Sequence, residues 1–119
     1  MSDYVYWVLD TEVRDGKMDA LKALMKEMVD ATQANEPGTL NFEWTISGDN
    51  KRVSLLERYR DSASAVIHVK AFMGKYAQRF MECLEVKKFV THGNTSDELN
   101  KMLSGMGSKF MTPFGGFSR

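Results

Sequence analysis

The chain has 119 residues, of which 43% are hydrophobic and 27% are charged, a composition typical of one soluble globular domain. Lysine plus arginine equals aspartate plus glutamate at 16 each, so no net charge favours nucleic acid or an anionic membrane. Cys83 is the single cysteine, which excludes an intramolecular disulfide, and the first apolar run is too short for a signal peptide or a membrane span. We therefore expect a cytoplasmic protein that binds neither nucleic acid nor membrane.

The start of the chain predicts a strand followed by a helix. Residues 4–13 are rich in aromatic and β-branched side chains, which favour a pleated, half-buried strand. In residues 17–35 the apolar side chains recur every three or four positions, which is the spacing of an amphipathic helix. Pro37 ends that helix because it lacks a backbone N–H group and restricts the residue before it.

A hairpin is predicted next. Residues 39–47 alternate apolar and polar side chains, and residues 52–60 follow a polar turn as the second arm. One face of this second arm carries Val53, Leu55, Glu57 and Tyr59.

The remainder of the first 93 residues predicts a second helix and a last strand. Asp61 or Ser62 is suited to cap the helix, Gly74 is expected to interrupt it, and residues 86–93 read as a strand. The resulting order is β-α-β-β-α-β, which is the ferredoxin-like α+β arrangement, with a broken second helix. We expect residues 1–93 to form this domain.

Residues 94–119 are predicted to be an extension of the domain. Thr95 and Glu98 have the spacing of a capping box and precede a short amphipathic helix that ends near Gly105. The final segment is unusually aromatic for a disordered tail, so we expect it to dock. Either it covers its own domain, or it reaches a partner subunit or closes a pocket.

Three stretches taken in order resemble the antibiotic biosynthesis monooxygenase family of dimeric α+β barrels. They are "EPGTLNFEW", "LLERYRD" and "SASAVIHVKAF", and the ending "PFGGFSR" is similar to an extension found in some quinol monooxygenases of this group. The resemblance covers about residues 4–93. It implies a homodimer in which two sheets pack face to face across a twofold axis.

The resemblance also implies a chemistry. Members of this family include oxygenases that need neither metal nor flavin, because a deprotonated quinol or polyphenol supplies the electrons to O2 itself. Such a site needs a base that titrates near neutrality and an apolar pocket with flat walls, and His68 is the candidate base. We expect Glu57 or Tyr59 to orient His68. The candidate substrate-binding residues are Trp7, Trp44, Glu57, Tyr59, Phe72 and Phe80.

Other interpretations of the same residues remain open. The aromatic side chains are core residues first, and His68 in a buried structural pair would look identical in sequence. His92 ends the last strand and has a weaker claim to function. A non-catalytic dimer that binds a small apolar ligand, or an isomerase that uses His68, are the alternatives to an oxygenase.

Three further functions fit the sequence less well. Haem-degrading members of this family use a histidine on the broken helix to bind iron. The corresponding stretch of this chain, "MGKYAQRFMECL", contains no histidine. No metal site is expected, because two histidines 24 residues apart and one cysteine make a poor ligand set. An RNA-binding sheet would need exposed aromatics among basic residues, whereas the second strand carries Glu43.

Overall fold

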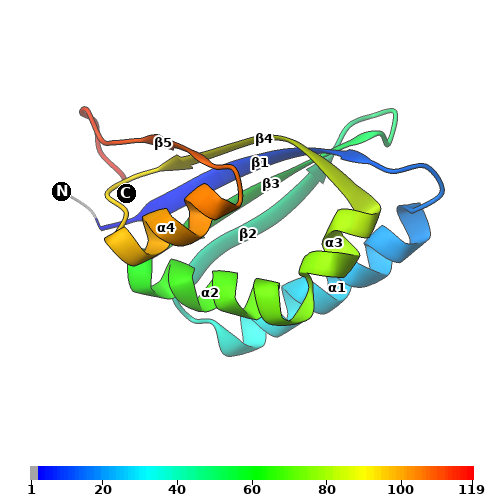
Figure 1. Cartoon of the computed structure of the whole chain (residues 1–119), viewed down its shortest axis with the longest axis horizontal. Coiled ribbons are helices and arrows are strands. Elements are labelled where there is room, and N and C mark those ends of the chain that lie inside the picture. The colour runs from blue at the N-terminus through cyan, green and yellow to red at the C-terminus, as the bar shows by residue number, and fades with distance from the viewer. Residues whose placement is uncertain (1–2) are drawn as a thin grey trace.

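In the computed structural model, which describes residues 3–119, five strands form one sheet and four helices lie on one of its faces (Figure 1). The elements in chain order are β1 Val5–Val13, α1 Met18–Asn35, β2 Thr39–Ile46, β3 Arg52–Tyr59, α2 Ser62–Lys75, α3 Ala77–Cys83, β4 Leu84–His92, α4 Asp97–Gly105 and β5 Lys109–Met111.

The strand order in the sheet is β2-β3-β1-β4-β5. The pairs β2–β3, β1–β3 and β1–β4 are antiparallel, and β5 adds to β4 in parallel. The first four strands with α1, α2 and α3 are therefore the predicted ferredoxin-like α+β unit, which confirms the fold class. Within this register Trp7 lies opposite Glu57 across the β1–β3 pair.

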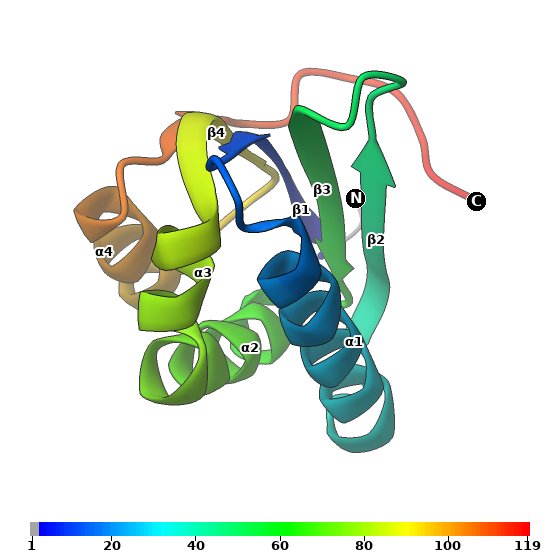
Figure 2. The ribbon, with the colours of Figure 1, turned by 90° about the vertical axis from the view of Figure 1, so that its right-hand side faces the viewer.

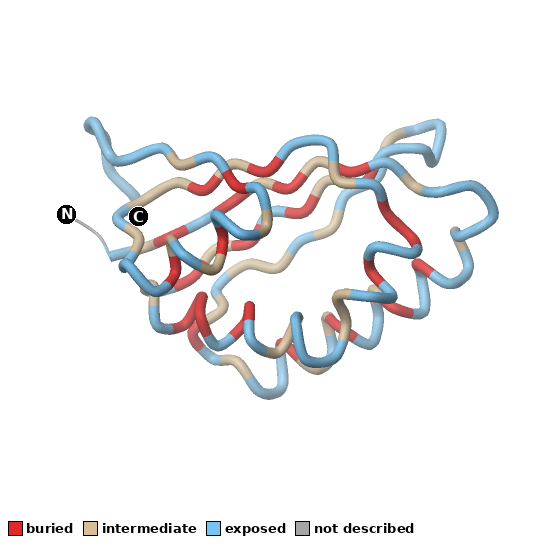
Figure 3. The backbone as a smooth tube through the Cα atoms, viewed as in Figure 1, coloured by how far each residue is buried: buried red, intermediate tan, exposed pale blue. Residues whose placement is uncertain are grey.

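The two faces of the sheet differ in burial because alternate side chains point to opposite sides. On the helix side, Trp7, Leu55 and Tyr59 are almost fully buried, as is the inner stripe of α1 (Figure 3). On the other side, called the outer face here, Tyr6 is 39% exposed and Leu56 is 38% exposed. The core of the chain thus lies between the sheet and the helices.

The second helix is broken as predicted, but not at Gly74. Asp61 caps α2 by accepting a hydrogen bond from the Ser64 amide, and the helix continues through Gly74 to Lys75. The break lies at Tyr76, whose backbone leaves the helical region at φ −124° and ψ −20°. One helical glycine costs only about 1 kcal/mol, and a helix held by buried side chains on its inner face tolerates it.

The C-terminal extension is partly built into the core. Ser96, rather than Thr95, caps α4, because its hydroxyl accepts the Leu99 amide. Leu99 and Leu103 of this helix are fully buried, and α4 packs against α2. After β5 the tail crosses the outer face, where the Ser118 hydroxyl lies 3.5 Å from the Arg58 guanidinium of β3 (Figure 2). The tail therefore lies on the side of the sheet away from α2.

Among the helices of residues 3–119, none has the length and apolar character needed to cross a bilayer.

Candidate functional site

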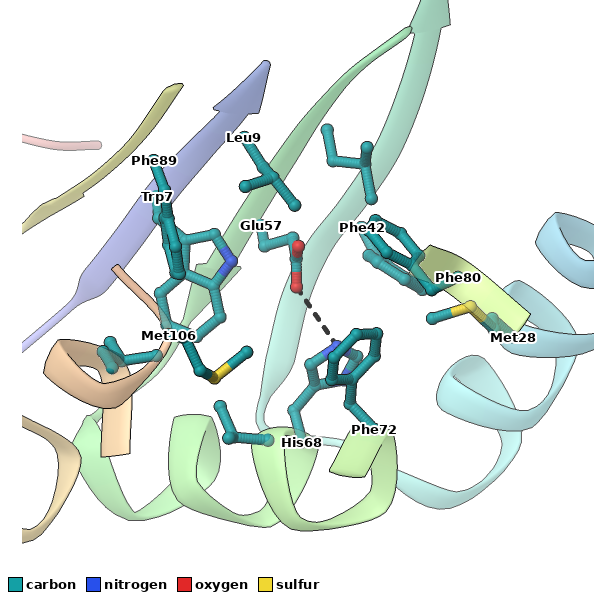
Figure 4. Close-up of a pocket in the computed structure, with 13 residues that line it drawn as sticks. Trp7, Leu9, Met28, Phe42, Glu57, His68, Phe72, Phe80, Phe89 and Met106 are labelled. Atoms are coloured by element: carbon teal, nitrogen blue, oxygen red, sulfur yellow. Dashed lines mark ion pairs between the residues drawn. The ribbon is translucent and has the colours of Figure 1, made fainter. Parts of the chain in front are cut away.

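A cavity of about 40 Å³ lies between the helix-facing side of the sheet and α2 (Figure 4). This is room for one or two water molecules. A ring-sized ligand therefore requires side chains in the wall to move. The lining residues are Trp7, Leu9, Met28, Phe42, Leu55, Glu57, His68, Val69, Phe72, Phe80, Phe89, Leu103 and Met106.

His68 lies on the buried side of α2 between two carboxylates. Its Nδ1 lies 2.9 Å from Glu36 Oε1, and its Nε2 lies 3.1 Å from Glu57 Oε1. Glu36 follows the last residue of α1 and Glu57 belongs to β3, so the imidazole joins three elements that are distant in sequence. All three side chains are at most 10% exposed.

The protonation of His68 follows from these neighbours. Burial alone would lower the pKa of the imidazole, but the hydrogen bonds and negative charges of Glu36 and Glu57 outweigh it and raise the pKa to about 9. The sequence suggested a group that titrates near neutrality. His68 is instead an imidazolium at neutral pH, because both of its nitrogens face acceptors.

Glu57 is held by a second donor. The Tyr59 hydroxyl donates a 2.7 Å hydrogen bond to Glu57 Oε1, the same oxygen that faces His68. Burial and the nearby charge of Glu57 raise the pKa of Tyr59 well above its usual value, so the phenol keeps its proton. Tyr59 thus orients the carboxylate of Glu57, and its ring lies 5.5 Å from that of His68.

The predicted substrate-binding residues fall into two groups. Trp7, Phe72 and Phe80 line the cavity together with Glu57 and His68. Trp44 and Tyr59 lie behind this wall: the Trp44 ring packs edge-on against Phe80 at 6.0 Å, and Tyr59 packs on Trp7 at 4.7 Å. The indole nitrogen of Trp44 is buried and has no hydrogen-bond acceptor within residues 3–119.

Sequence reasoning missed several lining residues. Phe42 packs edge-on to His68 at 5.0 Å, and Phe89 packs on Trp7 at 5.9 Å. Both lie on strands and carry no signal beyond that of a core residue. Met28 and Met106 close the cavity from α1 and from the segment after α4 (Figure 4).

Comparison with known sequences and folds identifies the family. The sequence model for antibiotic biosynthesis monooxygenase matches residues 5–82, which is more than half of the chain. The chain belongs to the antibiotic biosynthesis monooxygenase family. No curated protein matches it.

Solved structures agree with this fold. MupZ from Pseudomonas fluorescens is 20% identical with a TM-score of 0.85, and the match covers 99% of this chain and 96% of MupZ. Rv0793 from Mycobacterium tuberculosis is 23% identical with a TM-score of 0.64, over 79% of this chain and 97% of that one. A proposed antibiotic biosynthesis monooxygenase from Nitrosomonas europaea is 18% identical with a TM-score of 0.64, over 76% and 88%. At these identities the likeness shows the fold alone.

The Glu-Pro-Gly stretch, one of the pieces that resembled this family, positions the second carboxylate. Glu36 reaches His68, Pro37 follows the end of α1, and Gly38 lets the chain approach α2 closely. A Cβ atom at Gly38 would lie 2.5 Å from the Cβ atom of Ser64. The sequence analysis did not predict Glu36 as a site residue. Its place in the Glu-Pro-Gly stretch was the one feature that pointed to it.

His92 lies outside the site. It ends β4 on the outer face, where its ring stacks on Tyr6 with centroids 4.8 Å apart. It is therefore a candidate for surface contacts rather than for the chemistry around His68.

The site has one net negative charge, from two carboxylates and one imidazolium. No group of three His, Cys, Asp or Glu side chains within residues 3–119 is arranged to hold a metal ion. The arrangement is suited to exchange a proton with a ligand that lies among aromatic rings.

Proposed function

We propose that this member of the family is a cofactor-independent monooxygenase that acts on a quinol, polyphenol or related hydroxylated ring. The observation that carries the proposal is the His68–Glu57 pair on the wall of an otherwise apolar cavity. An acid–base pair in a dry pocket is suited to take the proton from a hydroxyl group and keep water from the resulting anion.

The chemistry requires no external reductant. A phenol that loses its O–H proton and one ring C–H proton becomes a quinone and supplies four electrons. One atom of O2 forms the new C=O group, and the other leaves as water with the two protons. The protein contributes the proton acceptor, the stacking walls and a pocket in which apolar O2 dissolves.

The side chains of the cavity wall favour a flat ligand whose entry displaces some of them. Phe72 and Phe80 pack edge-on with centroids 5.3 Å apart, and Trp7 faces them across the cavity (Figure 4). Met28 and Met106 have unbranched, adaptable side chains, so we expect them to move first when a ring enters.

Oxygen consumption tests this function. With 1-naphthol as the probe, we expect one O2 to be consumed for each molecule oxidised, and one labelled oxygen atom to appear in the quinone when 18O2 is supplied. His68→Gln and Glu57→Gln should each lower the rate at least about 100-fold, whereas Glu43→Gln, an exposed carboxylate on β2, should not change it.

Two outcomes would contradict the oxygenase. Equal oxygen uptake in the His68→Gln variant and the original protein would remove the histidine from the mechanism. Turnover of a probe without O2 would favour the isomerase.

We also propose that two copies of the chain associate through their outer faces. Tyr6 and Leu56 are exposed in the centre of this face, and the tail rings Phe114 and Phe117 stand exposed beside them. A groove of about 640 Å³ on the same face is lined by Tyr6, Leu56, Arg58 and the tail. Because each copy carries exposed rings next to a groove, a twofold axis would pair the rings of one copy with the groove of the other.

The state of association in solution tests the dimer. Light scattering should give twice the mass of the chain at micromolar concentration, and Leu56→Asp should give a monomer because it places a charge in the contact. Ile67→Asp is the matched control, since Ile67 is 57% exposed on α2, on the opposite side of the sheet. A monomeric original protein would refute this contact and leave the chemistry at His68 untouched.

A further inference from the structure

We propose that the proton acceptor of this site is the Oε2 atom of Glu57, and that His68 stays protonated through the reaction, held as a cation by Glu36. This inference rests on the proposed function in one respect, namely that the ligand carries a hydroxyl group. It assigns to Glu57 the role that the sequence suggested for His68.

His68 has no free ring nitrogen. Nδ1 faces Glu36 Oε1 at 2.9 Å and Nε2 faces Glu57 Oε1 at 3.1 Å. An ionised carboxylate offers only lone pairs, and a nitrogen lone pair directed at it would be repelled, so both nitrogens carry protons and the ring is an imidazolium. Neither nitrogen has a lone pair to offer to a ligand.

The two carboxylate oxygens of Glu57 differ in their partners. Oε1 accepts a hydrogen bond from the Tyr59 hydroxyl and lies 3.1 Å from His68 Nε2. No group within residues 3–119 donates a hydrogen bond to Oε2. Glu57 lines the cavity between Trp7 and Phe42, and Figure 4 shows its second oxygen directed away from the imidazole. Oε2 is therefore the polar atom with free lone pairs at this cavity.

The cluster around His68 carries a net negative charge. The titratable groups that face the imidazole are Glu36 from the end of α1, and Glu57 and Tyr59 from β3. Tyr59 is neutral, so the two carboxylates and the imidazolium sum to one negative charge. A ligand anion would be repelled, and a neutral hydroxyl compound would bind by donating to Oε2.

Proton transfer then moves the negative charge from the cluster to the ligand, and the total charge of cluster and ligand is unchanged. The O–H bond of the ligand breaks, an O–H bond forms at Oε2, and the electron pair stays on the ligand oxygen. The imidazolium of His68, which lies 3.1 Å from the other oxygen of the same carboxylate, offsets the new anion. Glu36 is a positioning residue in this scheme, because it contacts His68 and does not line the cavity.

The two histidines of the chain allow a direct test. In protein labelled with 15N-histidine, NMR reports the protons on each ring nitrogen, and His92 is the internal reference. We expect His68 to carry protons on both nitrogens at pH 7, without a ligand and with the probe 4-nitrophenol bound. Glu36→Gln should lower the pH at which His68 titrates and change 4-nitrophenol affinity by less than about threefold.

Binding of the same probe tests the acceptor. Glu57→Gln should weaken 4-nitrophenol binding roughly 10-fold or more, because a charge-assisted hydrogen bond is lost. Glu43→Gln, a carboxylate exposed on β2, should not weaken it.

Three results would overturn the proposal. They are a neutral imidazole at pH 7, uptake of a proton by His68 when 4-nitrophenol binds as its yellow anion, and unchanged affinity in Glu57→Gln. The NMR result on the original protein stands even if a variant fails to fold. Neither measurement uses O2, so a failure of the oxygenase proposal remains distinguishable from a failure of this one.

Discussion

Replacing His68 with alanine is expected to lower the free energy of unfolding by about 3–5 kcal/mol at pH 7. The variant keeps Glu36 and Glu57, both buried, without the cation that lies between them. Two uncompensated carboxylates in the core repel each other and have lost their solvation by water. Urea denaturation of the variant and the original protein measures the loss.

The pH dependence separates this cause from simple loss of packing. In the original protein the pKa of His68 is raised from 6.5 to about 9, so its contribution, about 3 kcal/mol, is fully present below pH 6.5. It declines as pH rises and is lost above pH 9. In His68→Ala this contribution is absent at every pH. The gap between the two curves should therefore be widest below pH 6.5 and narrow as the pH rises through 9.

Two further variants sharpen the comparison. The double variant His68→Ala, Glu36→Gln has one carboxylate fewer and should be more stable at pH 7 than His68→Ala alone. His92→Ala, on the outer face, should shift stability by less than about 1 kcal/mol. A pH-independent loss in His68→Ala would mean that the imidazole matters only for packing.

Much of the architecture could be predicted because it depends on local periodicity. The alternation in β3 placed Glu57 and Tyr59 on the buried face, and the spacing in α1 gave its inner stripe. The predicted position of the helix break, Gly74, was wrong because it rested only on the low intrinsic helix propensity of glycine. The fold places that break at Tyr76, two residues later, in a half-buried position that packs against the core.

The site was predicted only where its residues share an element or a family motif. His68 and Phe72 are one turn apart on α2, and Glu57 faces them from the sheet. Glu36 was missed because its contact with His68 spans 32 residues and depends on how α1 ends. The raised pKa of His68 could not be predicted either, because it depends on the contacts of His68 with both Glu36 and Glu57.

The partner of the Tyr59 hydroxyl also could not be predicted from the sequence. The sequence offered Glu57 and Tyr59 as equal candidates to orient the imidazole. The structure distinguishes the two residues. Glu57 contacts His68 through a carboxylate oxygen, whereas Tyr59 donates a hydrogen bond that holds this carboxylate in place. Such an order within a network depends on distances of a few tenths of an ångström, which no sequence pattern encodes.

Gly38→Ala is the substitution that should disturb the site most without touching it. The new methyl group would lie 2.5 Å from the Cβ atom of Ser64, so the first turn of α2 must move away from the segment after Pro37. Forced overpacking of this kind costs about 1–3 kcal/mol. Thermal or urea denaturation measures this cost.

Two variants make the interpretation of Gly38→Ala specific. Ser64→Gly removes the atoms in conflict and should recover part of the stability in the double variant, which a cycle of four proteins measures. Gly74→Ala, in the same helix with no atom within 4 Å of the new methyl group, should stabilise by about 0.5–1 kcal/mol.

The effect on His68 links this backbone contact to the chemistry. When α2 shifts, Glu36 and His68 separate, and the imidazole keeps only Glu57 as a partner. The pH at which His68 titrates should then fall in Gly38→Ala and return in the double variant with Ser64→Gly. If His68 titrates at the same pH in all of these proteins, the close approach at Gly38 does not position the Glu36–His68 pair. Glu36 would then be held by the end of α1 and by its hydrogen bond from the Thr39 hydroxyl.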